Sequence, residues 1–117
     1  MSANNVSIDG RLGKDAEKFG SDNGPVKFSI CHNKSRKDKI TGEWENDPHW
    51  FDVVTWGKLR DKTISLKKGD LVVISGKLET NRWEDKDGNK RVDVVVVADS
   101  VGVVPRTDAT TAEESDW

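Results

Sequence analysis

Tryptophans and basic side chains are the residues of this chain whose types and spacing could support chemistry. The stretch DPHWFDVVTWGKL, residues 47–59, holds two tryptophans six residues apart in a strand-like pattern. Because successive side chains of a strand point to opposite faces, one face carries Trp50, Asp52, Val54 and Trp56, and the other carries Phe51, Val53 and Thr55. Burying Asp52 without a partner would be costly, so the second face is the predicted core and the indoles are predicted to be exposed. An indole at the end of a strand can also fill the end of a barrel. Burial of Trp56 in the core therefore remains an alternative.

The spacing of the two indoles fits a ligand that offers several flat rings. Six residues of strand span roughly 20 Å, so Trp50 and Trp56 cannot stack on one another. Single-stranded nucleic acid presents such rings, and each base stacked on an aromatic side chain contributes about 1 to 3 kcal/mol. Two further tryptophans lie in polar segments, Trp44 after TGE and Trp83 beside Arg82.

Basic residues cluster around these rings in the sequence. Charged loops are often merely solvated, but here both long polar segments combine their bases with a tryptophan, as expected of a cationic groove with stacking platforms. The candidate nucleic-acid-binding bases are Arg36, Lys39, Lys58, Lys68, Arg82 and Arg91.

Charge is distributed unevenly along the chain. The net charge is −2, but residues 1–106 hold 19 bases and 17 acids, and TDATTAEESDW at the C-terminus holds four acids and no base. This pattern predicts a domain over 1–106 and a disordered acidic tail over 107–117. The tail either binds a partner or serves only as a solvated terminus.

Catalytic, metal and cofactor chemistry are not expected. The two histidines, His32 and His49, lie in polar contexts outside any metal-ligand spacing, and no phosphate-binding GxxxxGK[ST] loop occurs. Cys31 is the only cysteine, so no intramolecular disulfide can form. The N-terminus lacks targeting features and no apolar run approaches the ~18 residues of a membrane span. A cytoplasmic protein without enzymatic activity or cofactor is expected.

The order of the expected elements predicts a small barrel. Alternating apolar residues indicate strands over residues 5–13, 25–33, 49–56, 70–80 and 92–104, with long polar hairpin loops at 34–48 and 84–91. Glycines bound a short helix of two to three turns within residues 57–69. Five strands with one helix between the third and fourth is the order of the all-β oligonucleotide/oligosaccharide-binding barrel, the OB-fold. The inward residues are predicted to include Val26, Phe28, Ile30, Val72, Ile74 and Leu78.

Over roughly residues 4–104 the chain resembles the bacterial-type single-stranded DNA-binding proteins (SSB). The matching segments include NNVSIDGRLGKDAE, HWFDVVTWGKL, LKKGDLVVISGKLETNRWEDKDGNKR and VVVVADSVGVV. The resemblance implies an OB-fold that assembles into homodimers or homotetramers and stacks bases on Trp50, Trp56 and Trp83.

The sequence departs from the pattern of that family in three places. Arg36 occupies a position where many members have an aromatic residue, so this site either stacks through the guanidinium or shifts to Trp44. Asp52 and Glu79 stand where basic residues are common. The tail is short and ends in tryptophan, which is compatible with a phage, plasmid or paralogous member.

The resemblance implies sequence-independent binding of single-stranded DNA on the nucleoid during replication, recombination and repair. Two alternatives remain open, namely a primosomal-type OB adaptor that acts through protein contacts and a binder of single-stranded RNA. By its acidic and aromatic composition the C-terminus is a candidate site for replication or repair proteins, through Glu113, Glu114, Asp116 and Trp117.

Overall fold

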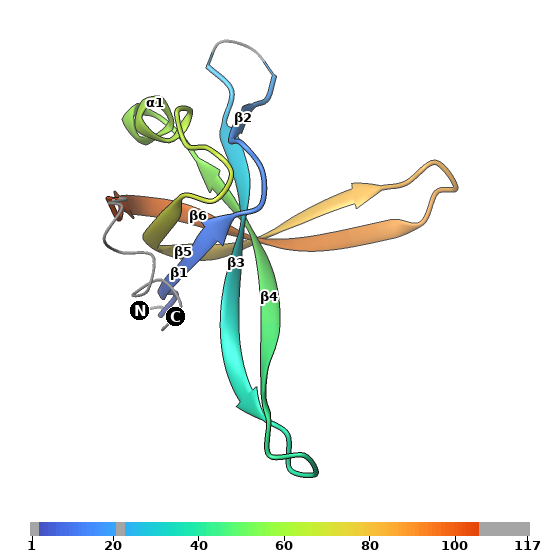
Figure 1. Cartoon of the computed structure of the whole chain (residues 1–117). Helices are drawn as coiled ribbons and strands as arrows, with labels where there is room; N and C mark the ends of the chain where they lie inside the picture. The colour runs from blue at the N-terminus through green and yellow to red at the C-terminus, as the bar shows by residue number, and fades with distance from the viewer. Residues whose placement is uncertain (1–2, 21–22, 106–117) are drawn as a thin grey trace.

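The strands close into a barrel in a computed structural model that describes residues 3–20 and 23–105 (Figure 1). The strands are β1 (Val6–Leu12), β2 (Glu17–Lys18), β3 (Val26–Lys37), β4 (Trp44–Thr55), β5 (Leu71–Glu84) and β6 (Lys90–Val103), and the helix is α1 (Lys58–Thr63). The sheet order is β1-β5-β6-β4-β3-β2, and an additional β1–β3 pairing closes five of the strands on themselves. The short β2 only adds an edge to β3. The predicted five-stranded OB-type barrel, with its helix after the third barrel strand, is confirmed.

Strand β1 closes the barrel because it pairs on both sides. It lies antiparallel to β5 from Val6 to Arg11, and its end, Arg11 and Leu12, pairs with β3. Gly10 permits the close approach, since a Cβ at that position would lie 2.7 Å from the carbonyl oxygen of Cys31. Gly10 therefore lies where the chain joins the two edges of the sheet.

The barrel core is built from the alternating apolar residues. Val26, Phe28 and Ile30 are 0–3% exposed, as predicted. A buried hydrogen bond of 2.7 Å between the hydroxyls of Thr55 and Thr63 ties β4 to α1. The core cluster comprises Leu12, Phe28, Ile30, Val53, Leu66, Val72, Ile74, Val96, Ala98 and Val101.

Three positions depart from the predicted pattern of burial. Leu78 is 45% exposed and Phe51 36% exposed, although both were assigned to the core. Each lies where its strand leaves the barrel to form an arm. Side chains still alternate between the two faces there, but the inner face no longer covers the barrel core. Val54 shares the tryptophan face but is buried, and it stands beside Val97 of the parallel neighbour β6.

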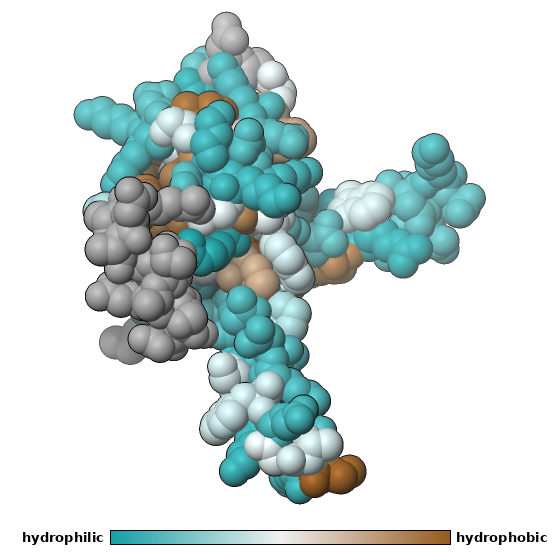
Figure 2. All heavy atoms as spheres, in the orientation of Figure 1, coloured by the Kyte–Doolittle hydropathy of each residue, from teal (hydrophilic) through white to brown (hydrophobic). Residues whose placement is uncertain are grey.

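Both predicted hairpin loops are in fact two-stranded arms. Pairing of β3 with β4 continues to Lys37 opposite Trp44, and pairing of β5 with β6 continues to Glu84 opposite Lys90. In Figure 1 the two arms extend away from the barrel in different directions. Figure 2 shows mainly hydrophilic atoms along the arms, with an apolar spot at the tip of the β3–β4 arm. Because water reaches both faces of an arm, its strands lack the apolar alternation that reveals a strand in the sequence.

The helix is shorter than predicted, with six residues in place of two to three turns. Thr63 at its end and Leu66 just after it are both buried. Within the residues described, none of the helical segments has the length and hydrophobicity required to span a bilayer.

Candidate nucleic-acid interface

Strand β4 carries two exposed indoles on one face. Trp44 is 70% exposed and Trp50 is 59% exposed. Pairing with β3 is regular from one to the other, so these residues, six apart, point to the same side of the arm. Asp52 shares this face and accepts a hydrogen bond of 2.7 Å from the hydroxyl of Ser29. The face thus carries two separate exposed indoles along a single strand.

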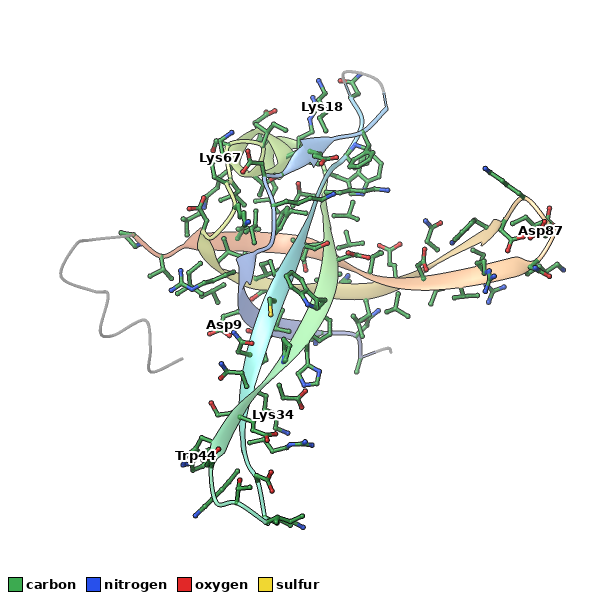
Figure 3. All side chains as sticks on the ribbon, turned by 45° about the vertical axis from the view of Figure 1, so that its right-hand side comes forward. Asp9, Lys18, Lys34, Trp44, Lys67 and Asp87 are labelled. Carbon is green, nitrogen blue, oxygen red and sulfur yellow. The ribbon has the colours of Figure 1, made fainter. Side chains whose placement is uncertain are left out.

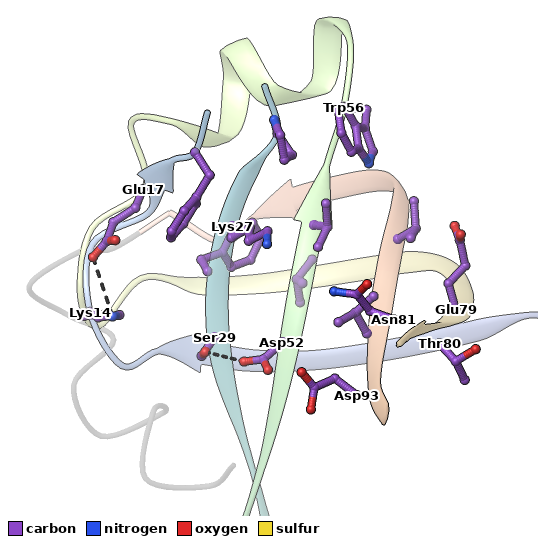
Figure 4. Close-up of a pocket in the computed structure, with 17 residues that line it drawn as sticks. Lys14, Glu17, Lys27, Ser29, Asp52, Trp56, Glu79, Thr80, Asn81 and Asp93 are labelled. Carbon is purple, nitrogen blue, oxygen red and sulfur yellow. Dashed lines mark hydrogen bonds and ion pairs between the residues drawn. The ribbon is translucent and has the colours of Figure 1, made fainter. Parts of the chain in front are cut away.

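Trp56 follows β4 directly and remains 54% exposed, so the alternative of a core plug is wrong for the single chain. It lines a groove of about 580 Å³ that runs over β3, β4, β5 and β6 (Figure 4). The floor is apolar and includes Val53, Val54, Val95 and Val97.

The charged lining of this groove is mostly acidic. Its carboxylates are Glu17, Asp52, Glu79 and Asp93, whereas its lysines are Lys14 and Lys27. The ammonium of Lys14 is engaged by Glu17 at 3.5 Å. The cationic groove predicted from the sequence is therefore wrong for this lining, which carries more acids than bases and includes both Asp52 and Glu79.

Trp83 lies on the β5–β6 arm, on the face that continues into the groove. Its indole N–H donates to the carboxylate of Asp93 at 2.9 Å, and the side chain is 46% exposed. Asn81 and Glu79 follow at alternating positions of the same strand and line the groove. The exposed indole of the second arm therefore lies on the face that leads into the groove lined by Trp56.

Three predicted bases lie close to an indole in sequence or register. Lys58 begins α1 two residues after Trp56. Arg91 stands directly opposite Trp83 in the β5–β6 register, and its Nε donates to Asp85 at 3.1 Å. Lys39 is exposed in the turn that joins β3 to β4, and Trp44 begins β4 at that end of the arm (Figure 3).

The other three predicted bases lie elsewhere. Arg36 pairs in register with Glu45, on the face opposite Trp44, and approaches its carboxylate at 4.0 Å. Arg82 is exposed on the arm face opposite Trp83. Lys68 follows α1, where its backbone N–H donates to Asp15. Of the two candidates for the first arm, Trp44 rather than Arg36 shares the face of Trp50.

Sequence reasoning missed an aromatic and cationic pair at the end of the groove. Phe19 is 42% exposed, and the ammonium of Lys27 lies 5.0 Å from the centre of its ring. Both residues line the groove together with Trp56. The signal was present, because Lys27 alternates with the inward Val26 and Phe28 and must therefore point outward.

The two histidines occupy the other face of β3 and β4. His32 and His49 are directly opposite one another, and His32 Nδ1 lies 2.9 Å from a carboxylate oxygen of Asp9. In the part of the chain that the structure describes, no three histidine, cysteine or acidic residues are arranged to hold a metal ion. The tail residues Glu113, Glu114, Asp116 and Trp117 lie outside the described residues.

Comparison with known proteins identifies the fold and the family of this chain. The SSB of Plasmodium falciparum, solved in complex with ssDNA, superposes with a TM-score of 0.74 at 20% identity, covering 90% of this chain and 97% of that chain. A small single-stranded DNA-binding protein from Streptomyces coelicolor matches with a TM-score of 0.70 at 21% identity, covering 89% and 96%. At these identities the structures establish the shared barrel. The sequence pattern of the single-strand binding protein family matches residues 3–104, nearly all of the barrel and its arms. The chain belongs to the single-strand binding protein family.

Proposed function

We propose that this protein binds single-stranded DNA irrespective of sequence, by stacking bases on its exposed tryptophans. The observation that carries the proposal is that Trp50, Trp56 and Trp83 are all exposed around one groove and its two flanking arms. Family membership and the fold shared with SSB of Plasmodium falciparum, which was solved with ssDNA, support the same ligand. Coating of exposed strands during replication, recombination and repair is the cellular role that we propose, on the nucleoid and without catalysis.

Single strands suit this surface better than duplex DNA. The bases of a duplex are stacked on one another and cannot lie on an indole, whereas an unpaired strand can offer its rings one after another. Trp44 adds a fourth platform at the far end of the first arm, and Phe19 with Lys27 extends the groove beyond Trp56. Lys39, Lys58 and Arg91 are the bases whose positions suit them to phosphates between these platforms.

The test is a fluorescence titration with a thymine-rich single strand and a duplex of equal length. We expect strong quenching by the single strand and little by the duplex. The variants Trp50→Ala and Trp83→Ala should each lose about 1 to 3 kcal/mol of binding. Ile64→Ala is the matched control, since it removes an exposed apolar side chain at the end of α1, away from the groove. Unchanged affinity in both tryptophan variants, with native circular dichroism, would exclude the platforms.

A protein-binding adaptor is the second candidate, and the acidic lining of the groove favours it. Four carboxylates against two lysines weaken the attraction for phosphates. An adaptor predicts no quenching by either nucleic acid. Base stacking does not distinguish RNA from DNA, because it does not involve the 2′-hydroxyl. Competition between matched DNA and RNA strands is therefore the test of which nucleic acid the protein prefers.

We further propose that the protein associates with itself and recruits replication or repair proteins through its C-terminus. An aromatic terminal residue preceded by acids suits capture in an apolar pocket with a basic rim. Mass measurement with and without a long single strand tests the assembly. Deletion of residues 113–117 should leave DNA binding equal or tighter and abolish partner capture. Identical sets of captured proteins for the full and truncated chains would remove the tail from the functional account.

A further inference from the structure

Gly13 lies directly after β1, and the indole of Trp50 occupies the space beside its Cα. We propose that Gly13 is a positioning residue whose missing side chain lets this indole lie along the barrel wall as a stacking platform. The inference rests on the proposed function, because it explains how one of the proposed platforms is held. It assigns a role in DNA binding to a residue that has no side chain to contact a base or a phosphate.

The contact is specific to the ring. A Cβ built on Gly13 would lie 2.6 Å from Cζ3 and 2.8 Å from Cη2 of Trp50. The third nearest atom, at 3.8 Å, is Cε3 of the same indole, so outside its immediate chain neighbours Gly13 has no other close contact at this position. Any side chain larger than hydrogen must therefore displace Trp50 before it meets anything else.

The strand pairing shows how far the indole reaches. The N–H of Gly13 donates to the carbonyl of Ser29 on β3, so Gly13 runs along one side of β3. Trp50 stands on the other side, opposite Cys31 of the same strand. The indole therefore crosses the width of β3, and neighbouring strands lie about 5 Å apart. A ring that spans this distance lies along the barrel surface, and it still leaves 59% of the residue exposed to a base.

Backbone conformation does not require glycine at this position. Gly13 is absent from the glycines with positive φ, which are Gly20, Gly42, Gly57, Gly69 and Gly88. Alanine therefore fits its backbone without strain. Gly10 and Gly76 differ, because a Cβ at either would meet the main chain of a neighbouring strand, that of Cys31 or Val97. Substitution at Gly13 thus tests the ring alone.

A methyl group at Gly13 should move the indole rather than unfold the barrel. Ordinary contact between carbon atoms is about 3.5 to 4.0 Å, so the ring must shift by roughly 1 Å or turn away from the wall. A displaced ring no longer presents the same face to the strand that crosses it. We expect a loss of single-strand affinity of about fivefold to a hundredfold, the range that corresponds to one stacked base.

The experiment is a double-mutant cycle on the full chain with a thymine-rich single strand. The variants are Gly13→Ala, Trp50→Ala and the double substitution, with Gly102→Ala as the matched control because its nearest atom, the carbonyl oxygen of Val73, is 3.9 Å away. We expect Gly13→Ala to lower affinity with a parental melting temperature, and to have no further effect once Trp50 is alanine. Gly102→Ala should bind like the parent. Tryptophan emission should change on Gly13→Ala only when Trp50 is present.

Each outcome decides the inference. If Trp50→Ala lowers affinity and Gly13→Ala does not, the inference is wrong and the proposed function stands. An equal loss from Gly13→Ala in both backgrounds also overturns it, because Gly13 would then act independently of the indole. If Trp50→Ala has no effect, this platform itself fails. Should Gly13→Ala not fold, folding of the double variant would support the clash, and failure of the double variant would overturn it.

Discussion

The exposed tryptophans differ in how the protein holds their rings. The indole of Trp83 is fixed by its hydrogen bond to Asp93, and the indole of Trp50 is set against Gly13. A ring that is already oriented loses less side-chain freedom when a base stacks on it, which strengthens binding for the same contact area. At the scale of single residues, Trp50 and Trp83 are thus each paired with a neighbour that limits where the ring can lie.

The first prediction concerns the two candidates on the β3–β4 arm. Trp44→Ala should cost about 1 to 3 kcal/mol of binding to a strand long enough to reach the arm, because a stacked base is lost. Arg36→Ala should have a smaller effect, since the guanidinium lies on the opposite face beside Glu45. Titration of both variants with a long and a short oligonucleotide measures this, and a larger loss for Arg36→Ala would mean that the strand crosses the other face.

The second prediction concerns the carboxylates of the groove. Neutralising Asp52 and Glu79 as Asp52→Asn and Glu79→Gln should tighten single-strand binding at low salt. The expected gain is about 1 kcal/mol, or roughly fivefold, for each charge that lies near a phosphate. Asparagine retains an oxygen that can accept the hydrogen bond from Ser29, so the fold should be preserved. Weaker binding by these variants would indicate that the carboxylates contact the bases instead.

The turns at the ends of both arms are each organised by one aspartate. Asp38 accepts the N–H groups of Ile40 and Thr41, and the first of these bonds is the main reason that the pKa of Asp38 lies below its ordinary value of 3.8. The pKa of Asp85 is lowered chiefly by the N–H of Asn89, and also by Arg91. The turn at the end of each arm is thus stabilised by an ionised carboxylate, that of Asp38 in the first arm and that of Asp85 in the second.

The third prediction follows from the sign of these shifts. A lowered pKa means that the carboxylate stabilises the folded turn above 3.8, and that this contribution disappears as pH falls through the lower pKa of the folded protein. As the pH falls, we expect the turn amides of Ile40 and Asn89 to lose their protection from exchange, measured relative to the unfolded chain at the same pH, before the barrel amides do. Hydrogen exchange followed by NMR measures this, with Asp38→Ala as a variant whose first turn should exchange fast at every pH. Simultaneous loss of protection in arms and barrel would contradict it.

The elements differ in how well the sequence predicts them. Strands within the barrel have one dry face, so Val26, Phe28 and Ile30 alternate with polar residues and reveal both strand and core. Arms have two wet faces, which is why residues 34–48 and 84–91 were interpreted as loops. For the site, alternation correctly separates Trp50 from Val53, but cannot show which strands become neighbours. The acidic groove and the contact of Gly13 with Trp50 depend on residues far apart in sequence, which only the closed barrel brings together.

At the scale of the whole molecule, the net charge of residues 1–106 and the charge of the groove lining have opposite signs. Residues 1–106 carry two more bases than acids, yet the groove lining holds more acids than bases. Most of the positive excess lies around α1, because residues 58–70 hold five bases and two acids, whereas residues 34–47 of the first arm hold four of each. We therefore expect a strand in the groove to receive its phosphate contacts mainly from bases outside the groove lining.

The fourth prediction is that binding weakens with salt, but moderately. Each phosphate neutralised on a single strand adds about 0.7 to the slope of log affinity against log salt concentration. Few lysines and arginines lie beside the platforms, so we expect a slope that corresponds to a small number of contacts. Titrations across a range of salt concentrations measure it, with Lys58→Ala and Arg91→Ala each expected to reduce the slope by one contact. Affinity independent of salt would mean that these bases only solubilise the protein.

The double pairing of β1 also determines when the barrel can close as the chain is synthesised. β1 has only Arg11 and Leu12 to pair with β3, whereas its pairing with β5 runs from Val6 opposite Gly76 to Arg11 opposite Leu71. A nascent chain that has not yet released residues 71–76 from the ribosome therefore lacks the main partner of its first strand. Contacts of such long sequence separation carry a large loop-closure cost, so we expect them to form late in folding. We therefore expect the β3–β4 hairpin to form before the N-terminal strand closes the barrel beneath its tryptophans.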